Sequence, residues 1–230
     1  MLILHQVHQL EPGSIDSFES FVRDEVLPSV ASDPGSRLFW YASATDVSTR
    51  GREAITMIAL QDAQTLERFA TRMRSGDLAA VGNQLNRMRR GVETRIAKPL
   101  RHNPLTIDVS ALPTSAVENH PTISYMHDFV PPRIGQRRAY EDAMVKIYGA
   151  MSDRELLDIA LWAGLEPVAG PVPEQINISR IQNIDVLVNL FVNDIPREHK
   201  QLGTWMHEAL KLRDRWTTRL VRCAPWSPLY

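Results

Sequence analysis

Two histidines on predicted strands are the side chains of this sequence best suited to proton transfer. Successive strand residues point to opposite faces, so each histidine shares a face with every second neighbour. The two rows are Leu4, Gln6, His8 and Leu10 in one segment and Ile123, Tyr125, His127 and Phe129 in the other. Each row is apolar except for the histidine and one further polar group, which is typical of the lining of an enclosed ligand cavity.

A neutral imidazole in such a lining could remove a proton from a phenol or an enol near neutral pH. We therefore predict His8 and His127 as catalytic residues and Gln6 and Tyr125 as substrate-binding residues. Two imidazoles facing each other in one apolar cavity would resist protonation, so at least one is expected to titrate below about 6.5. The alternative is that both histidines are structural, either hydrogen-bonded across strands or exposed.

Three aromatic residues lie on further predicted strands: Trp40, Tyr41 and Trp162. They either fill the core or form walls for a planar ligand, and we predict them as substrate-binding residues. His5 and His8 have the spacing of a metal-binding pair, but on a strand they project to opposite faces and cannot chelate one ion. We therefore predict no metal site and no cofactor.

The composition excludes several classes of function. The 26 Lys and Arg residues balance 27 Asp and Glu residues, and the arginine-rich stretch 68–90 contains a single aromatic residue, Phe69, which argues against nucleic-acid binding. A glycine-rich phosphate loop, HExxH, G-x-S-x-G and paired CxxC motifs are all absent, which argues against nucleotide-binding, zinc-protease and serine-hydrolase classes. The single cysteine, Cys223, cannot form an internal disulfide and favours a reducing compartment.

The apolar runs are too short to cross a bilayer, which takes about 20 apolar residues. The first residues also lack the basic segment of a signal peptide. We therefore expect a cytoplasmic monomer or homodimer. Its expected partner is a small hydrophobic molecule rather than nucleic acid or a membrane.

The chain contains a weak internal repeat. Aligning His8 with His127 also aligns Pro12 with Pro131, and the stretch 87–100 matches 213–226. We interpret this as two copies of one unit of about 100 residues. The predicted domains are residues 1–100 and 122–230, joined by a proline-containing linker, 101–121, whose alternating pattern at 105–109 indicates a possible edge strand.

Each copy is predicted to have the order β-α-β-β-α-β. Periodicity places strands at 2–10, 37–44, 53–60 and 94–98 in the first copy, with helices after Ser14 and across 63–90. In the second copy strands are expected at 122–130, 156–165, 175–182 and 219–223, with helices at 136–151, at 185–192 and from 194 to 216. This order is that of a ferredoxin-like α+β unit.

The segment LEPGSIDSFESFVRDEVLPSVASDPGSRLFWY resembles the dimeric α+β barrel superfamily, especially its NIPSNAP-like and antibiotic-biosynthesis-monooxygenase-like branches. The matching features are the Pro12-Gly13 turn, the Leu27-Pro28 helix end and the strand that carries Trp40. The resemblance implies that the two units pack sheet to sheet as a pseudo-dimer within one chain. It also implies a range of activities: cofactor-free monooxygenases, cyclases, haem-binding enzymes and proteins without known activity.

The resulting hypothesis is a small-molecule enzyme of secondary metabolism, monooxygenase-like or cyclase-like. It would act on a hydrophobic, aromatic or polyketide-like substrate in the barrel, where proton removal gives a carbanion that reacts with oxygen or an internal carbonyl. One alternative is a non-catalytic NIPSNAP-like ligand-binding or interaction module, favoured if aromatic side chains fill the barrel. Another, implied by the resemblance, is a haem enzyme with His199 or His207 as ligand, although His207 is expected on a solvated face.

Overall fold

The computed structural model describes residues 1–44, 52–101, 103–118, 120–152, 159–170 and 174–230. In the first half, the strands are β1 (Leu2–Leu10), β2 (Ser36–Ala44), β3 (Glu53–Leu60) and β4 (Arg89–Pro99). The helices of that half are α1 (Ile15–Phe21), the π-helical η1 (Val22–Val26), α2 (Leu27–Ala31), α3 (Ala63–Ser75) and α4 (Leu78–Met88).

The second half repeats this order. Its strands are β5 (Ile123–Val130), β6 (Ile159–Ala169), β7 (Gln175–Ile181) and β8 (Thr217–Cys223). Its helices are α5 (Arg137–Ser152), α6 (Ile184–Asn189), the π-helical η3 (Leu190–Asp194), α7 (Ile195–Lys200) and α8 (Trp205–Ala209). Both halves therefore have the predicted α+β order.

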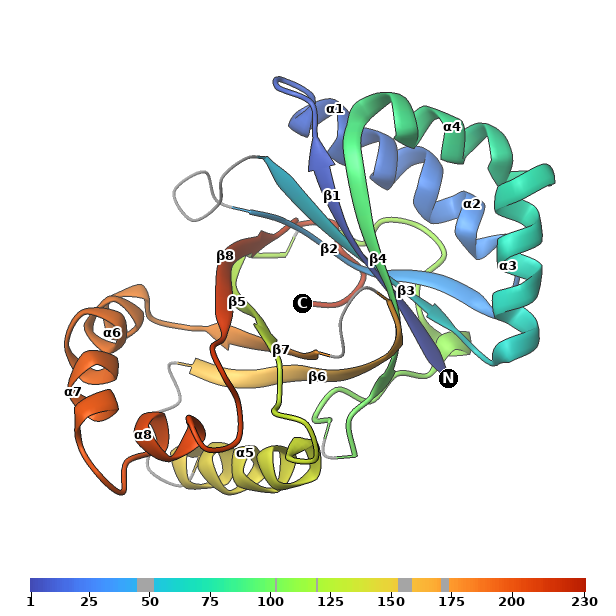
Figure 1. The fold of residues 1–230 in the computed structure, drawn as a ribbon. Coiled ribbons are helices and arrows are strands. Elements are labelled where there is room, and N and C mark those ends of the chain that lie inside the picture. Colours follow the sequence, from blue (N-terminus) through green and yellow to red (C-terminus); the bar gives the residue numbers. More distant parts are fainter. Residues whose placement is uncertain (45–51, 102, 119, 153–158, 171–173) are drawn as a thin grey trace.

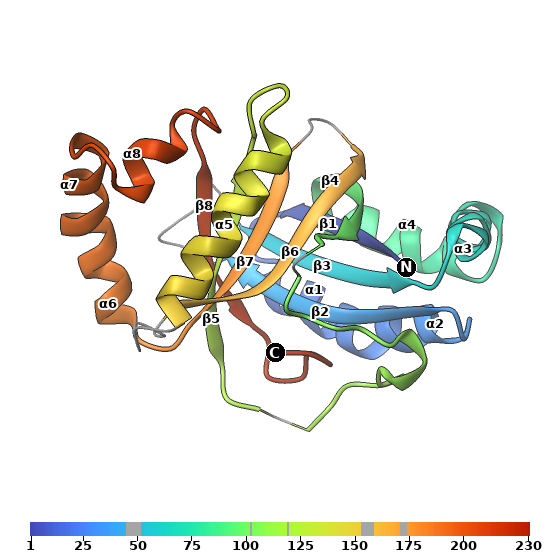
Figure 2. The same cartoon turned by 90° about the horizontal axis from the view of Figure 1, so that it is seen from below.

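The eight strands form one closed antiparallel barrel in the order β1-β3-β2-β8-β5-β7-β6-β4. The halves meet where β2 pairs with β8 and β4 pairs with β6. Figure 1 shows helices α1–α4 on one side of the barrel and α5–α8 on the opposite side, and Figure 2 shows the same arrangement from below. The predicted sheet-to-sheet packing of two ferredoxin-like units within one chain is confirmed.

Closure of the barrel leaves every strand with one face inside and the other under helices. The interior is one cluster of apolar side chains from both halves, including Val7, Phe39 and Ile178. The outer faces carry separate clusters, one in the first half and two in the second. Both faces of most strands are therefore apolar, so the sequence pattern does not indicate which face lies inside the barrel.

Two helix boundaries differ from expectation. Pro28 is expected to end the first helix, but helical structure continues to Ala31 because Pro28 sits in the first turn of α2, after η1, where a missing N–H is tolerated. The helix expected from 194 to 216 is two short helices, α7 and α8, separated at Gly203, whose φ of 82° favours glycine.

The linker forms no strand among its described residues. It carries one short 3-10 helix, η2 (Val109–Ala111), while Leu105, Ile107 and Leu112 pack against the interior cluster of the barrel. The prediction of a possible edge strand at 105–109 is therefore wrong. Because β4 already pairs with β6, the barrel offers no free edge there, and the alternating apolar residues are buried against its core instead. No helix in the described ranges is long and apolar enough to span a membrane.

Candidate functional site

Two histidines meet at the centre of the barrel, one from each half. The Nε2 atoms of His5 and His127 lie 2.8 Å apart, their rings are nearly parallel, and both side chains are fully buried. At this distance one ring donates a hydrogen bond and the other accepts it, so the two imidazoles are not both protonated. Burial, followed by the charges of Arg95 and Arg219, lowers the pKa of His5 to about 3. Burial likewise lowers the pKa of His127 far below its ordinary value.

Charged residues surround this pair in a pseudo-symmetric arrangement. His5 lies opposite Arg95 on β4, and His127 lies opposite Arg219 on β8. Both guanidinium groups lie over the ring of Phe129, at 4.4 and 5.0 Å from its centroid. Each arginine pairs with a glutamate of the other half: Arg95 with Glu174 at 2.9 Å and Arg219 with Glu53 at 2.7 Å. We call this group the barrel centre.

His8 is not part of the barrel centre, so the expected convergence of His8 and His127 is wrong. His8 lies on the outer face of β1, where its ring contacts Phe18 of α1. Its Nε2 is 2.9 Å from the Thr56 hydroxyl, and its Nδ1 is 2.7 Å from an Arg89 nitrogen. Burial, then the charge of Arg89, lowers the pKa of His8 to about 3.

The true counterpart of His127 is His5. They are 122 residues apart, as are Gly13 and Gly135, which occupy the turns after β1 and β5 with φ of 80° and 79°. The alignment of His8 with His127 is off by three residues. An odd shift moves every side chain of a strand to the other face, which is why it selected the wrong histidine.

The predicted aromatic residues divide between the two sides of the barrel wall. Trp40, Trp162 and Tyr125 contact one another inside the barrel, with ring centroids 5.5–5.6 Å apart. Tyr41 lies on the outer face against Trp226, at 5.0 Å. Gln6 also faces outward, and its amide nitrogen donates a hydrogen bond to Thr94 at 3.1 Å. The structure therefore brings together three of the five predicted substrate-binding residues, Trp40, Trp162 and Tyr125, and separates Gln6 and Tyr41 from them.

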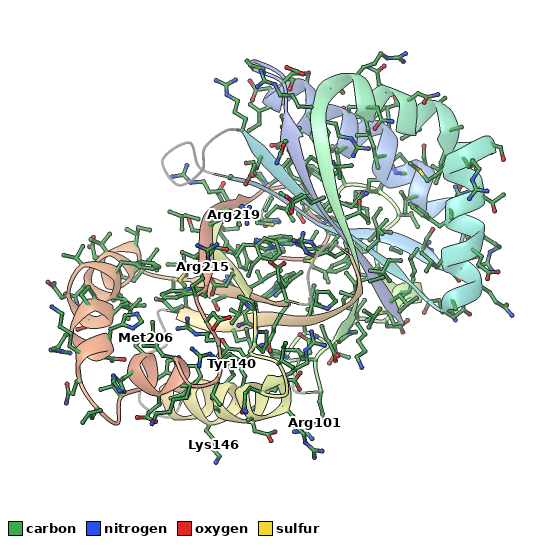
Figure 3. All side chains as sticks on the ribbon, viewed as in Figure 1. Arg101, Tyr140, Lys146, Met206, Arg215 and Arg219 are labelled. Atoms are coloured by element: carbon green, nitrogen blue, oxygen red, sulfur yellow. The ribbon has the colours of Figure 1, made fainter. Side chains whose placement is uncertain are left out.

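A cavity of about 520 Å³ lies between the helices and the sheet of the second half. It separates the two outer clusters of that half, one around Leu187 of α6 and the other around Tyr140 of α5. In Figure 3, Tyr140 and Met206 lie on the sides of α5 and α8 that face the sheet, whereas Lys146 points away. The volume of this cavity is in the range of small-molecule sites. We call it the second-half cavity.

Asp128 is the most unusual polar group in the lining of this cavity. It lies on β5 next to His127 in sequence but faces the helices, is 5% exposed, and its Oδ1 has no hydrogen-bond partner within the described ranges. Burial raises the pKa of Asp128 to about 7, outweighing the lowering by the side chains of Thr218 and Trp216 and by the charge of Arg213. A carboxyl group with this pKa is suited to proton transfer near neutral pH.

Other polar groups of the lining are placed around Asp128. Asn177 is its cross-strand neighbour on β7, and the Asn177 amide oxygen accepts a hydrogen bond from Gln175 at 2.8 Å, which leaves the Asn177 amide nitrogen as a donor. Arg213, 3% exposed, lies over the ring of Trp216 at 4.9 Å. The cavity thus combines one candidate base with two donors that can stabilise an anion.

Asp128, Asn177 and Arg213 were not predicted from the sequence. One signal was present: Asp128 shares a strand face with the apolar Met126 and Val130, where a buried carboxylate is costly and often functional. Asn177 and Arg213 lie in segments that look ordinary in sequence, and only the packing of α5 and α8 shows that they share a cavity with Asp128.

The residues present do not fit haem ligation by the predicted histidines. His199 lies on α7 and His207 on α8, and the Nδ1 of His207 is 3.1 Å from the backbone oxygen of His199. Neither imidazole lines the second-half cavity, and no histidine is among its described lining residues. Within the described ranges no group of three or more metal-ligating side chains occurs.

No protein-family model matches the sequence, and no curated protein matches it. Solved structures match nearly the whole chain. An anthrone oxidase-like protein is 10% identical with a TM-score of 0.61, covering 97% of this chain and 91% of that one. A candidate monooxygenase from Lactobacillus acidophilus NCFM is 9% identical with a TM-score of 0.59, covering 98% and 96%.

A third match is a single-residue mutant of chlorite dismutase from Candidatus Nitrospira defluvii. It is 12% identical with a TM-score of 0.57, covering 98% of this chain and 91% of that one. At these identities the likeness concerns the fold alone. The chain has the tandem dimeric α+β barrel fold, as the resemblance in its first half implied.

Proposed function

We propose that this chain is a small-molecule enzyme of the monooxygenase type, acting on a hydrophobic, aromatic or polyketide-like substrate in the second-half cavity. The observation that carries the proposal is the buried carboxyl of Asp128, with a pKa near 7, in the lining of a cavity of about 520 Å³. The fold shared with an anthrone oxidase-like protein and a candidate monooxygenase supports this reaction class.

Asp128 is the base in this proposal. Its ionised form takes a proton from an acidic C–H or O–H group of the substrate, and the resulting anion is delocalised over the aromatic system. Arg213 and the amide nitrogen of Asn177 stabilise the negative charge that develops on the substrate oxygen. The apolar lining, which includes Met144, Ile147 and Trp205, excludes water from the anion.

Oxygen completes the reaction without a bound cofactor. For an anthrone, the carbanion combines with O₂ to give a peroxide anion, which takes back the proton held by Asp128. The resulting hydroperoxide loses water to leave a quinone. One oxygen atom becomes the new carbonyl and the other leaves in water, so the substrate is oxidised and O₂ is reduced. The cyclase version shares the proton transfer, but the carbanion attacks an internal carbonyl instead.

The test uses anthrone itself as the probe. The purified full chain is incubated with anthrone in air, and anthraquinone formation and O₂ consumption are followed together. We expect quinone formation above the uncatalysed rate with one O₂ consumed per quinone. Loss of this activity in Val186→Trp, which narrows the cavity, and in Asp128→Asn would support the site. Activity that is unchanged in both variants would contradict it.

The alternative function is a non-catalytic ligand-binding module. It is favoured by the packing of the barrel interior, where Trp40 and Phe129 belong to the core cluster around the buried histidine pair and Trp162 packs against that cluster. Such a protein would bind the same hydrophobic molecules in the second-half cavity without converting them. Binding of anthrone without O₂ consumption, repeated with other phenolic polycyclic compounds, would favour this alternative.

A further inference from the structure

The helical run that covers the second-half cavity changes character along its length. Four side chains at intervals of four residues line the cavity from this run: Val186, Leu190, Asp194 and Glu198. Residues at this spacing lie on one face and here cover about three turns. An inward row on an amphipathic helix is normally apolar throughout. Here the row is apolar from Val186 of α6 to Leu190 of η3 and acidic from Asp194 of η3 to Glu198 of α7, with Ile195 as an apolar neighbour in the lining.

The two ends of the row face different surroundings. Near Val186 and Leu190 the outer cluster of the sheet contributes Met126 and Ile159. Near Asp194 and Glu198 the lining is completed from α8 and the turn before it, by Thr204, Trp205 and Met206. The cavity therefore has an apolar region and a region where carboxylates face aromatic side chains.

The carboxylates of the lining outnumber its cations. Asp128, Asp194 and Glu198 line the cavity, and Arg213 is the one cation among its described lining residues. Arg213 lies against Trp216 near Asp128, so these two charges offset each other. Asp194 pairs with Arg197, which is 69% exposed, at 3.1 Å. Glu198 makes no ion pair with any residue that the structure describes.

One buried acceptor without a partner points to a ligand that donates a hydrogen bond. The Oδ1 of Asp128 is buried and has no hydrogen-bond partner within the described ranges, although Asp128 is only 5% exposed. Such a group is costly unless a bound molecule or water satisfies it. Tryptophan and tyrosine rings, here Trp205 and Tyr140 with centroids 5.9 Å apart, attract a positive charge through their faces.

We propose that the ligand of the second-half cavity is an amphipathic molecule with an aromatic body and a positively charged amino group. The body lies against Met126, Ile159 and Leu190, and the ammonium lies near Glu198 and Trp205. This inference rests on the proposed function, because it assigns the substrate class of the same cavity. It excludes aromatic compounds that carry a negative charge at pH 7, which Asp194 and Glu198 repel.

Binding of three matched naphthalene compounds tests the charge preference. The neutral dye Nile red is bound to the full chain and displaced at pH 7 by 1-naphthylmethylamine, 1-naphthalenemethanol or 1-naphthoate. These probes share one ring system and carry a positive, zero or negative charge. We expect the amine to displace the dye at about tenfold lower concentration than the alcohol, and the carboxylate to be the weakest.

Variants locate the effect. The double variant Asp194→Asn, Glu198→Gln should bring the amine to the level of the alcohol and leave the alcohol unchanged. The matched control is Glu208→Gln on α8, because Glu208 pairs with Lys211 and is not a lining residue of the cavity. This control should retain the full preference for the amine.

The outcomes separate this inference from the proposed function. Equal displacement by all three compounds, or stronger displacement by the carboxylate, overturns the amine preference while leaving the cavity as a binding site. A preference that survives in the double variant also overturns it. If no compound displaces the dye and the dye itself does not bind, the proposed function fails together with this inference. Amine preference without anthrone oxidation would support the inference and contradict only the oxidation.

Discussion

The two halves of the chain share one fold, but their helix–sheet layers differ. In the first half this layer is a single apolar cluster, and the space left beneath the helices amounts to about 30 Å³, the size of one water molecule. In the second half two clusters are separated by a cavity of about 520 Å³. A repeated fold can therefore keep its barrel in both copies while only one copy provides room for a ligand.

The difference can be followed along one row of side chains on the outer face of the sheet. In the first half Thr94 and Thr56 lie beside Gln6, and the Gln6 amide bonds to Thr94. In the second half Thr218 and Asn177 lie beside Asp128, at the equivalent positions. A neutral amide with a partner is thus replaced by a buried carboxyl with an unpartnered oxygen.

The barrel centre, in contrast, is matched between the halves. His5, Arg95 and Glu53 in the first half correspond to His127, Arg219 and Glu174 in the second, and the ion pairs cross from one half to the other. The halves thus agree where they contact each other and diverge where each faces its own helices. This is the arrangement expected if the interior holds the pseudo-dimer together and one outer layer carries the function.

The largest expected effect concerns the matched interior and is a loss of stability in acid. The unfolded chain titrates its histidines near 6.5, whereas burial lowers the pKa of His5 to about 3 and also lowers that of His127. Between these values the unfolded state binds more protons, so the free energy of unfolding falls as the pH falls. For the pair we expect a loss of about 3 kcal/mol between pH 6.5 and pH 5.

Urea unfolding followed by tryptophan fluorescence at several pH values measures this loss. Asp128 changes the free energy of unfolding with pH in the opposite direction. Its raised pKa makes the folded state bind the extra proton between about pH 4 and 7, so this contribution to stability rises as the pH falls. The comparison is therefore between the natural chain and the double variant His5→Gln, His127→Gln, in which the acid-dependent loss should shrink by the stated amount. An equal slope in both proteins would show that the pair titrates normally.

The second expected effect compares how substitutions in the helix–sheet layers of the two halves change the enzymatic activity. Asp128→Asn should reduce anthrone oxidation by about 100-fold or more, because removal of a general base typically costs this much. In the natural chain kcat/KM should rise with pH through a midpoint near 7, as the Asp128 carboxyl becomes ionised. The equivalent change in the first half, Gln6→Ala, should leave the rate within about twofold.

His127→Gln separates this proposal from the sequence-based prediction that His127 is catalytic. His127 faces the barrel centre and not the second-half cavity, so we expect kcat/KM to keep its midpoint near pH 7 in this variant. A lost midpoint in His127→Gln with normal folding would assign the base to the histidine instead.

The sequence predicts the fold much better than the site. The β-α-β-β-α-β order follows from features that can be read from neighbouring residues: helical and strand periodicity, the Pro12-Gly13 turn and the internal repeat. The face of each strand is not such a signal here. In β1 both rows are buried, so polarity does not distinguish the interior row of Ile3, His5 and Val7 from the outer row that contains His8.

The cavity could not be predicted from the sequence either, for a different reason. Its existence depends on how α5, α7 and α8 are spaced above the sheet, which is decided by contacts between distant side chains such as Tyr140 and Trp205. Short helices broken at Gly203 carry little periodic signal. Only Asp128 was visible in the sequence, as a carboxylate on the strand face that it shares with the apolar Met126 and Val130.

The smallest expected effect tests the contrast in packing. Val22 of η1 and Val186 of α6 each face the space beneath the helices of their own half. Val22→Trp must force a large ring into a filled layer, where overpacking typically costs about 1–3 kcal/mol of unfolding free energy. Val186→Trp places the same ring in an open cavity, so its cost should stay below about 1 kcal/mol.

The paired measurements are urea unfolding and Nile red binding on the same two variants. Val186→Trp should weaken dye binding while retaining stability, because the indole occupies part of the second-half cavity. Val22→Trp should lower the urea midpoint and leave dye binding intact at low urea concentration. The reverse result, a destabilised Val186→Trp that still binds dye, would mean that the second layer is as closely packed as the first and that the contrast between the halves does not exist in solution.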